Sequence, residues 1–242
     1  MPSLASSTTA ADRPGSKGTV SVLLAAHNEA ATIASVIAGV RTVLPDALEV
    51  VVVDDGSGDA TAALAEAAGA RVIRLHPNRG KGVALRTAIQ ASHGDWLVLI
   101  DADGQDDPAD ITLLLAATGD GVAMVNGSRF IGRLHRGAIS LPNRLGNLAF
   151  TGLLDLLYGA RITDSQAGFR AVRGDLARGL ELSSVEYEIE TEMLAALLRS
   201  GLRVVEVPVE RYPRGGGETD FRRVRNGLRI LRTMISGRLR RR

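Results

Sequence analysis

The chain has 242 residues, of which 45% are hydrophobic and 23% charged, a composition typical of one large globular domain. It contains no cysteine, which excludes disulfide bonds, thiolate metal sites and a cysteine nucleophile, and its four histidines show no zinc-site spacing. No apolar run approaches the ~18 residues of a membrane span and there is no apolar signal-peptide core, so we expect a cytoplasmic protein.

Positive charge is concentrated at the C-terminal end. Nine of the 29 basic residues are arginines between Phe221 and Arg242, a stretch without any acid, so the first 220 residues hold 20 basic and 27 acidic residues. An acidic body with a basic tail predicts an anionic partner, either a membrane or a nucleic acid. Because only 3% of residues are aromatic, no base-stacking platform is evident, and we expect no nucleic-acid partner.

The predicted elements alternate between apolar strands and amphipathic helices. Strands are expected at residues 19–26, 48–53, 71–75, 96–100, 122–126 and 202–209, with a further short one within 161–173. Helices are expected at residues 28–44, 59–68, 82–92, 107–117, 141–158, 187–200 and 221–239. The alternation predicts an α/β fold with a mostly parallel central sheet flanked by helices, preceded by a disordered leader at residues 1–18.

Two aspartates follow the predicted strand at residues 96–100. Asp101 and Asp103 stand one residue apart and Gln105 follows two positions later, so their oxygens can be aimed at one point. Hard oxygen ligands of this kind suit Mg²⁺ or Mn²⁺. The spacing excludes an EF-hand, whose glycine stands sixth in the loop and whose glutamate stands twelfth. We therefore predict a divalent-metal site at the carboxyl edge of the sheet, where α/β proteins bind ligands.

Further polar motifs fall at the same predicted edge. Asp54 and Asp55 precede a Gly-x-Gly that lacks the third glycine of a dinucleotide fingerprint, so a carboxylate is expected to accept hydrogen bonds from a base or ribose. Residues 78–82, Asn-Arg-Gly-Lys-Gly, suit a diphosphate without forming a P-loop. With Arg129 after the fifth strand, acids for a metal and cations for phosphates predict a site for a metal-bound nucleoside diphosphate.

Seven motifs stand in order along the chain: HNEAATI, VVVDDGSGDAT, NRGKGVALRTAI, DWLVLIDADGQDDP, NGSRF, DSQAGFRAV and EIETEML. Together they resemble the family 2 glycosyltransferases, which have the GT-A fold, over about residues 21–233. The last two are similar to the branch of dolichyl-phosphate mannose synthase and bacterial polyprenyl-phosphate sugar transferases. That branch moves a sugar from a nucleotide donor to a polyprenyl phosphate, so the resemblance implies a GT-A catalytic domain at residues 19–220.

The resemblance also implies roles for individual residues. Donor binding falls to Ala25, His27, Glu29, Val53, Asp55, Lys81, Asp101, Ala102, Asp164 and Arg214. The acceptor phosphate is assigned to Arg129, Arg144 and Asn147, and the metal, Mg²⁺ or Mn²⁺, to Asp101, Asp103 and Gln105. Catalytic roles fall to Asp101, Asp103, Arg129 and Glu190.

The acceptor decides whether a general base is needed. A phosphate monoester, with a second pKa near ~6, is already an anion at neutral pH and needs only to be positioned. A sugar hydroxyl would need a carboxylate base, for which Glu188, Glu190 and Glu192 are the candidates. We expect direct displacement with inversion, transferring a sugar to a polyprenyl phosphate, with a soluble or glycan hydroxyl as the alternative acceptor.

The basic tail at residues 221–242 has two interpretations. An apolar stripe recurs among its arginines at helical spacing, formed by Val224, Leu228, Leu231, Ile235 and Leu239. Such a helix is typical of one lying on an anionic membrane, here on the cytoplasmic face, although the same stripe could pack on the domain. Two other functions are alternatives: a non-enzymatic adaptor for anionic surfaces, and a nucleotidyltransferase, which would need a glycine-rich loop that residues 25–29 lack.

Overall fold

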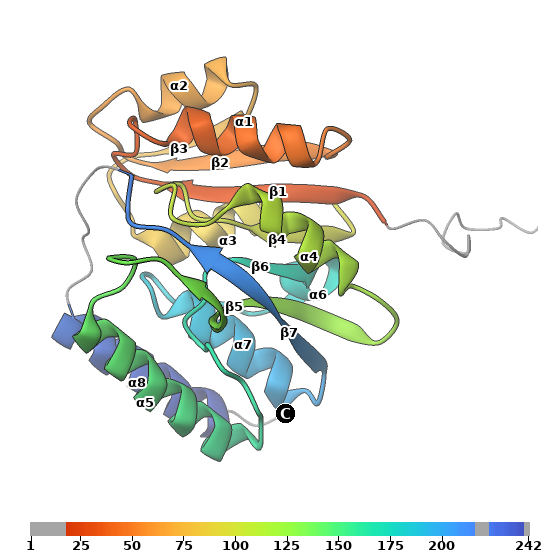
Figure 1. Ribbon diagram of the computed structural model, residues 1–242, viewed down its shortest axis with the longest axis vertical. Coiled ribbons are helices and arrows are strands. Elements are labelled where there is room, and N and C mark those ends of the chain that lie inside the picture. Colours follow the sequence, from red (N-terminus) through yellow and green to blue (C-terminus); the bar gives the residue numbers. More distant parts are fainter. Residues whose placement is uncertain (1–17, 216–222, 240–242) are drawn as a thin grey trace, which may run out of the picture.

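The computed structural model describes residues 18–215 and 223–239. All of the predicted leader except Gly18 lies outside the described residues, as do residues 221–222 and 240–242 of the predicted tail. The described strands form one seven-stranded sheet, in the order β3-β2-β1-β4-β6-β5-β7. Helices cover both of its faces (Figure 1).

The elements follow the predicted alternation closely. The strands are β1 (Val20–Ala26), β2 (Glu49–Asp55), β3 (Arg71–Leu75), β4 (Trp96–Leu99), β5 (Val122–Leu134), β6 (Arg170–Arg173) and β7 (Arg203–Arg211). The helices are α1 (Ile33–Val43), α2 (Thr61–Ala67), α3 (Lys81–Ala91), α4 (Ile111–Ala116), α5 (Leu141–Tyr158), α6 (Gly174–Gly179), α7 (Ile189–Arg199) and α8 (Arg223–Leu239).

The sheet is mostly parallel, as predicted. Only β6 is antiparallel to its neighbours, β4 and β5, while the remaining neighbouring strands pair in parallel. The carboxyl ends of β1, β2 and β4 therefore meet at one edge of the sheet. The polar motifs that follow these strands are brought together there.

Burial on both faces explains why the strands are continuously apolar. In β2, Val50 and Val52 pack on one side with α1 and α4, while Val51 and Val53 pack on the other with α3 and α7. Alternate side chains of a strand point to opposite faces, so a strand covered on both sides is apolar along most of its length.

The structure changes some predicted boundaries. The helix expected to start at residue 28 begins at Ile33, after Asn28 in a left-handed conformation with φ of 55°. The helix expected at 107–117 is a 3₁₀ turn, Pro108–Asp110, followed by α4; Asp107 caps the turn by accepting the Ala109 N–H at 2.9 Å. Strand β5 extends to Leu134, well past the predicted end, because its second half pairs with β7 beyond a bulge.

The C-terminal helix α8 packs on the domain. It lies beside α5 and contacts α7 (Figure 1), and Ile230 and Met234 are buried in the core on that side of the sheet. The Tyr158 hydroxyl donates a hydrogen bond to the Met234 carbonyl at 2.9 Å, which joins the two helices. None of the described helices is long and apolar enough to cross a membrane.

Candidate active site

A cleft of about 930 Å³ lies at the carboxyl edge of the sheet, and α5, α7 and α8 form its far side. It is lined by thirteen of the residues that the sequence assigned to the site: Ala25, His27, Glu29, Asp55, Lys81, Asp101, Ala102, Asp103, Gln105, Arg129, Asn147, Glu190 and Arg214. Parallel strand ends thus place nearly all of the predicted chemistry around one space.

Three predicted residues do not line the cleft. Val53 is fully buried within β2, where it packs in the core. Arg144 is exposed on α5, with its guanidinium 6.0 Å from the centre of the Phe130 ring. Asp164 is fully buried behind Arg129. Val53 thus packs in the core and Asp164 pairs with Arg129, and neither side chain lines the cleft.

Charged side chains around Asp101 and Asp103 form one ion-paired cluster. Lys81 Nζ lies 2.8 Å from Asp101 and 2.8 Å from Glu190, at the start of α7. Arg211, the last residue of β7, lies 3.6 Å from Asp101 and 3.8 Å from Asp103. Arg211 belongs to none of the seven motifs, although β7 is parallel to β5 and its predicted carboxyl end lies at the same edge of the sheet.

The cluster moves the pKa values of its members in opposite directions. Burial would raise the pKa of Asp101, but Lys81 and Arg211 hold it well below its ordinary value. Burial, and then the neighbouring Asp101 charge, raise the pKa of Asp103. Burial would lower the pKa of Lys81, but the Asp101 and Glu190 carboxylates raise it. Lys81 is therefore a permanent cation at the floor of the cleft.

The glycines beside Lys81 serve close packing. A side chain at Gly80, which has φ of 97°, would collide with the Val185 carbonyl, and one at Gly82 would collide with the Ser184 carbonyl. The carboxylate of Asp55 holds this loop by accepting the backbone N–H groups of residues 79 and 80, each at 2.8 Å. Residues 80 and 82 of the predicted diphosphate motif must therefore be glycines, because the backbone there lies against the segment that precedes α7. That contact brings Lys81 to Glu190.

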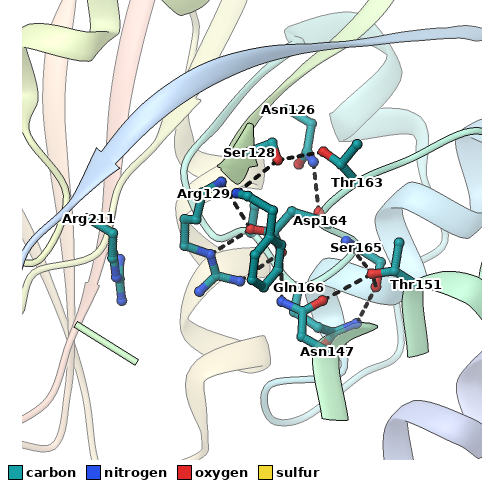
Figure 2. Close-up of polar contacts among 12 residues, drawn as sticks. Asn126, Ser128, Arg129, Asn147, Thr151, Thr163, Asp164, Ser165, Gln166 and Arg211 are labelled. Carbon is teal, nitrogen blue, oxygen red and sulfur yellow. Dashed lines mark hydrogen bonds and ion pairs between the residues drawn. The ribbon is translucent and has the colours of Figure 1, made fainter. Parts of the chain in front are cut away.

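A second charged unit surrounds Asp164. Its carboxylate accepts hydrogen bonds from Nε and Nη2 of Arg129, at 2.6 and 2.8 Å, and from the Asn147 amide, at 2.7 Å (Figure 2). Burial would raise the pKa of Asp164, but the Arg129 guanidinium lowers it below its ordinary value. Asp164 therefore stays ionised, and it fixes Arg129 of β5 to Asn147 of α5.

Three residues that the resemblance assigns to the donor, His27, Glu29 and Arg214, line the cleft after the ends of β1 and β7. His27 places Nδ1 3.0 Å from the Asp55 carbonyl, which orients its ring at the end of β1. Glu29 pairs with Arg214, which also lies 3.4 Å from Asp103. Burial raises the pKa of Glu29 to about 7, although the Arg214 charge opposes the shift. Arg214 thus joins the first loop of the chain to the segment after β7.

The oxygen donors in the cleft fit a divalent cation. Asp101 and Asp103 face the same Arg211 guanidinium, and Mg²⁺ commonly binds one or two carboxylates together with substrate phosphates. Within the described chain, no group of three or more acidic, histidine or cysteine side chains is arranged around a metal position. Gln105, also predicted as a ligand, instead accepts a hydrogen bond from Arg211 at 3.0 Å and donates to the Tyr212 carbonyl at 2.9 Å.

Comparison with known proteins assigns the family. The family model for glycosyl transferase family 2 matches residues 21–179. The chain belongs to glycosyltransferase family 2. It is therefore a glycosyltransferase rather than a non-enzymatic adaptor, and its mostly parallel sheet is the GT-A fold.

Several relatives of this glycosyltransferase are similar over most of their length. A dolichyl-phosphate hexose transferase of Haloferax volcanii is 32% identical over 89% of this chain and 92% of its own. An undecaprenyl-phosphate mannosyltransferase of Micrococcus luteus is 30% identical over 83% of this chain and 86% of its own. Glucosyl-3-phosphoglycerate synthase from Mycobacterium tuberculosis, solved with Mn²⁺ and UDP-glucose, superposes with a TM-score of 0.74 at 26% identity, covering 93% of this chain and 80% of that one.

Proposed function

We propose that this family 2 glycosyltransferase is metal-dependent and inverting, and that it transfers a sugar from a nucleoside diphosphate sugar to a polyprenyl phosphate at a membrane surface. One observation carries the proposal: the cleft runs from the Asp101 and Asp103 pair to a wall formed by α5 and α8. A donor at the sheet edge and an acceptor at the two helices would meet between Lys81 and Arg129.

The outer sides of these two helices support a membrane acceptor. Large apolar side chains are exposed on both: Leu141, Leu145, Leu148 and Leu156 on α5, and Leu228, Ile235 and Leu239 on α8. Ile230 and Met234 pack inward, so three members of the stripe predicted from the sequence face outward instead of packing on the domain. Helix α8 has arginines and no acid, a composition that favours an anionic membrane surface. A peripheral position on the cytoplasmic membrane face follows from the proposal.

The relatives support the same acceptor and a nucleotide donor. Two of them have names that specify dolichyl phosphate or undecaprenyl phosphate as the substrate. The structural neighbour binds UDP-glucose together with Mn²⁺. We extend both features to this chain as proposals, with Mg²⁺ or Mn²⁺ as the metal and the nucleobase left open to experiment.

The proposed mechanism assigns each group to a part of the two substrates. His27, Glu29 and Asp55 hold the nucleoside, and Lys81 with Arg211 and Arg214 neutralises the donor diphosphate. Asp101 and Asp103 would hold the divalent cation, which when bound supplies Lewis-acid stabilisation of the leaving diphosphate.

Arg129 orients the acceptor phosphate, which attacks the anomeric carbon from the side opposite the leaving group. The attack forms the new C–O bond as the bond to the diphosphate breaks, and this inverts the anomeric centre. A phosphate monoester brings its own negative charge, so no general base is required.

A hydroxyl acceptor is the second candidate, favoured by one specific observation. Glu190 lines the cleft and is 6% exposed, and its Oε2 makes no hydrogen bond with the described residues. That oxygen could accept a proton from a hydroxyl nucleophile. Glu188 and Glu192 do not line the cleft, and both carboxylates accept backbone N–H groups of the segment at residues 183–186, so Glu190 is the candidate base.

Thermal denaturation with candidate donors tests the proposal first. UDP, GDP, dTDP and their sugar conjugates are each added with and without Mn²⁺, because ligands that bind the native state raise the melting temperature. We expect a metal-dependent shift for one nucleotide, lost in Asp103→Ala and kept in the exposed control Asp120→Ala. Transfer to a polyprenyl phosphate is then measured with that donor, in wild type and Glu190→Gln. Wild-type transfer to a glycan hydroxyl but not to the polyprenyl phosphate, lost in Glu190→Gln with donor binding unchanged, would favour the hydroxyl acceptor.

A further inference from the structure

Asn226 is a buried polar residue on the first turn of α8. Only 4% of it is exposed, yet it lines the catalytic cleft. No hydrogen bond joins its side chain to residues 18–215 or 223–239, and its amide is not fully enclosed, because it borders the cleft. Most buried side-chain amides in proteins are hydrogen-bonded, because an unsatisfied one loses its hydration without compensation. An amide that faces a cleft in this state is suited to a ligand.

The surroundings of Asn226 favour an anionic ligand with an apolar body. The residue lies at the N-terminal end of a 17-residue helix, where the helix dipole is positive. Arg225 lines the same cleft, and among the described residues its guanidinium forms a 3.8 Å ion pair with Glu186. On the other side, Gly227 leaves Phe150 uncovered, since a Cβ there would lie 3.5 Å from its ring.

The groups that the sequence assigned to the acceptor phosphate are largely engaged elsewhere. Asn147 donates its amide to Asp164, and Arg129 donates Nε and Nη2 to the same carboxylate. Arg144 is exposed outside the cleft lining. A phosphate monoester presents three terminal oxygens and therefore needs more donors than these residues leave free.

We propose that the first turn of α8 binds the phosphate monoester of the acceptor, with the Asn226 amide donating to a phosphate oxygen and Arg225 supplying counter-charge. The assignment rests on the proposed function and adds a subsite to it. The family model matches residues 21–179, and helix α8 lies outside that region. The match to the family model therefore does not include the residues of the proposed subsite. The shared chemistry is a phosphate monoester, carried either by a polyprenol or by a small soluble acceptor.

Steady-state kinetics and equilibrium binding on Asn226→Ala test the subsite. We expect its KM for the acceptor to rise about tenfold, while its KM for the donor stays at the wild-type value. Its melting temperature should match or exceed that of wild type, because the amide has no hydrogen-bond partner to lose among the residues that the structure describes. A structural role for Asn226 would lower the melting temperature instead.

Two arginines of α8 provide a matched pair of variants. Arg225→Gln removes a charge from the cleft lining, and Arg232→Gln removes the same charge from the exposed side of the helix. Binding of geranyl phosphate and of 3-phosphoglycerate, each without vesicles, is measured by calorimetry. We expect Arg225→Gln to weaken binding and Arg232→Gln to leave it unchanged.

The outcomes separate the subsite from the function that it serves. Preference for geranyl phosphate identifies a lipid acceptor, and preference for 3-phosphoglycerate identifies a soluble one. If the wild type transfers sugar to neither acceptor, the proposed function fails, and the calorimetry still decides whether Asn226 binds phosphate. Unchanged acceptor affinity in both Asn226→Ala and Arg225→Gln would overturn the subsite, even in an enzyme that glycosylates polyprenyl phosphate.

Discussion

Replacing Asp164 with asparagine should destabilise the protein strongly, because each oxygen of this buried carboxylate accepts two hydrogen bonds. Oδ2 accepts Nε of Arg129 at 2.6 Å and its backbone N–H at 3.2 Å. Oδ1 accepts Nη2 of Arg129 at 2.8 Å and the Asn147 amide at 2.7 Å. Whichever oxygen becomes NH₂, two donors lose their acceptor and Arg129 loses its counter-charge.

The magnitude follows from the burial of the pair. Asp164 is fully buried and the Arg129 side chain is 14% exposed, so the unpaired guanidinium has little access to water. Removing one partner of a buried ion pair costs about 3–5 kcal/mol of unfolding free energy. For a domain of this size, that corresponds to a melting temperature lower by about 6–20 °C. The exposed pair of Arg173 and Asp175 should contribute less than about 1 kcal/mol.

Urea denaturation followed by circular dichroism measures these differences. We expect Asp164→Asn to lose the full amount and the surface control Asp175→Asn to stay near wild type. The double variant Arg129→Met/Asp164→Asn should recover more than half of the loss, because it no longer buries an unpaired charge. A loss below about 1 kcal/mol in Asp164→Asn, or a double variant no more stable than the single one, would refute the argument.

Three further changes test other parts of the site. Glu29 has a pKa of about 7 in the folded protein against 4.5 ordinarily, so its contribution to stability is complete below pH 4.5 and is lost as the pH rises to about 7. Denaturation from pH 5 to 8 should therefore show the free energy of unfolding of Glu29→Gln increasing relative to that of wild type. Parallel pH profiles of the two proteins would contradict this. Gly168→Ala places a Cβ 3.1 Å from Asp101, so we expect about tenfold slower transfer in a steady-state assay with little change in melting temperature, and full activity would show that Asp101 tolerates displacement. Leu145→Ser, on the exposed side of α5, should lower co-sedimentation with phosphatidylglycerol vesicles about tenfold, while Leu113→Ser on α4 leaves it unchanged; equal binding of both variants would exclude α5 from the membrane surface.

Local sequence pattern determined the order and type of most elements and the edge of the sheet that carries the site. Continuous β-branched runs such as that of β2 encode burial on both faces, and polar residues directly after a strand must lie at its end. These are short-range properties, so the sequence by itself predicts that Asp101, Asp103 and Lys81 lie in one site. The extension of β5 to Leu134 could not be predicted in this way, because it depends on pairing with β7, some eighty residues later.

Which partner each charged side chain meets was decided only by the tertiary structure. The motifs place Asp164 and Gln105 at the site. In the structure, Asp164 is buried behind Arg129 and pairs with it, and Gln105 accepts a hydrogen bond from Arg211 at the end of β7. Asn226 lies in a helix whose sequence shows only an amphipathic stripe, and it enters the cleft because α8 packs against α5 and α7. Ion pairs and orphaned amides depend on contacts between distant segments, and those contacts exist only after the chain has packed.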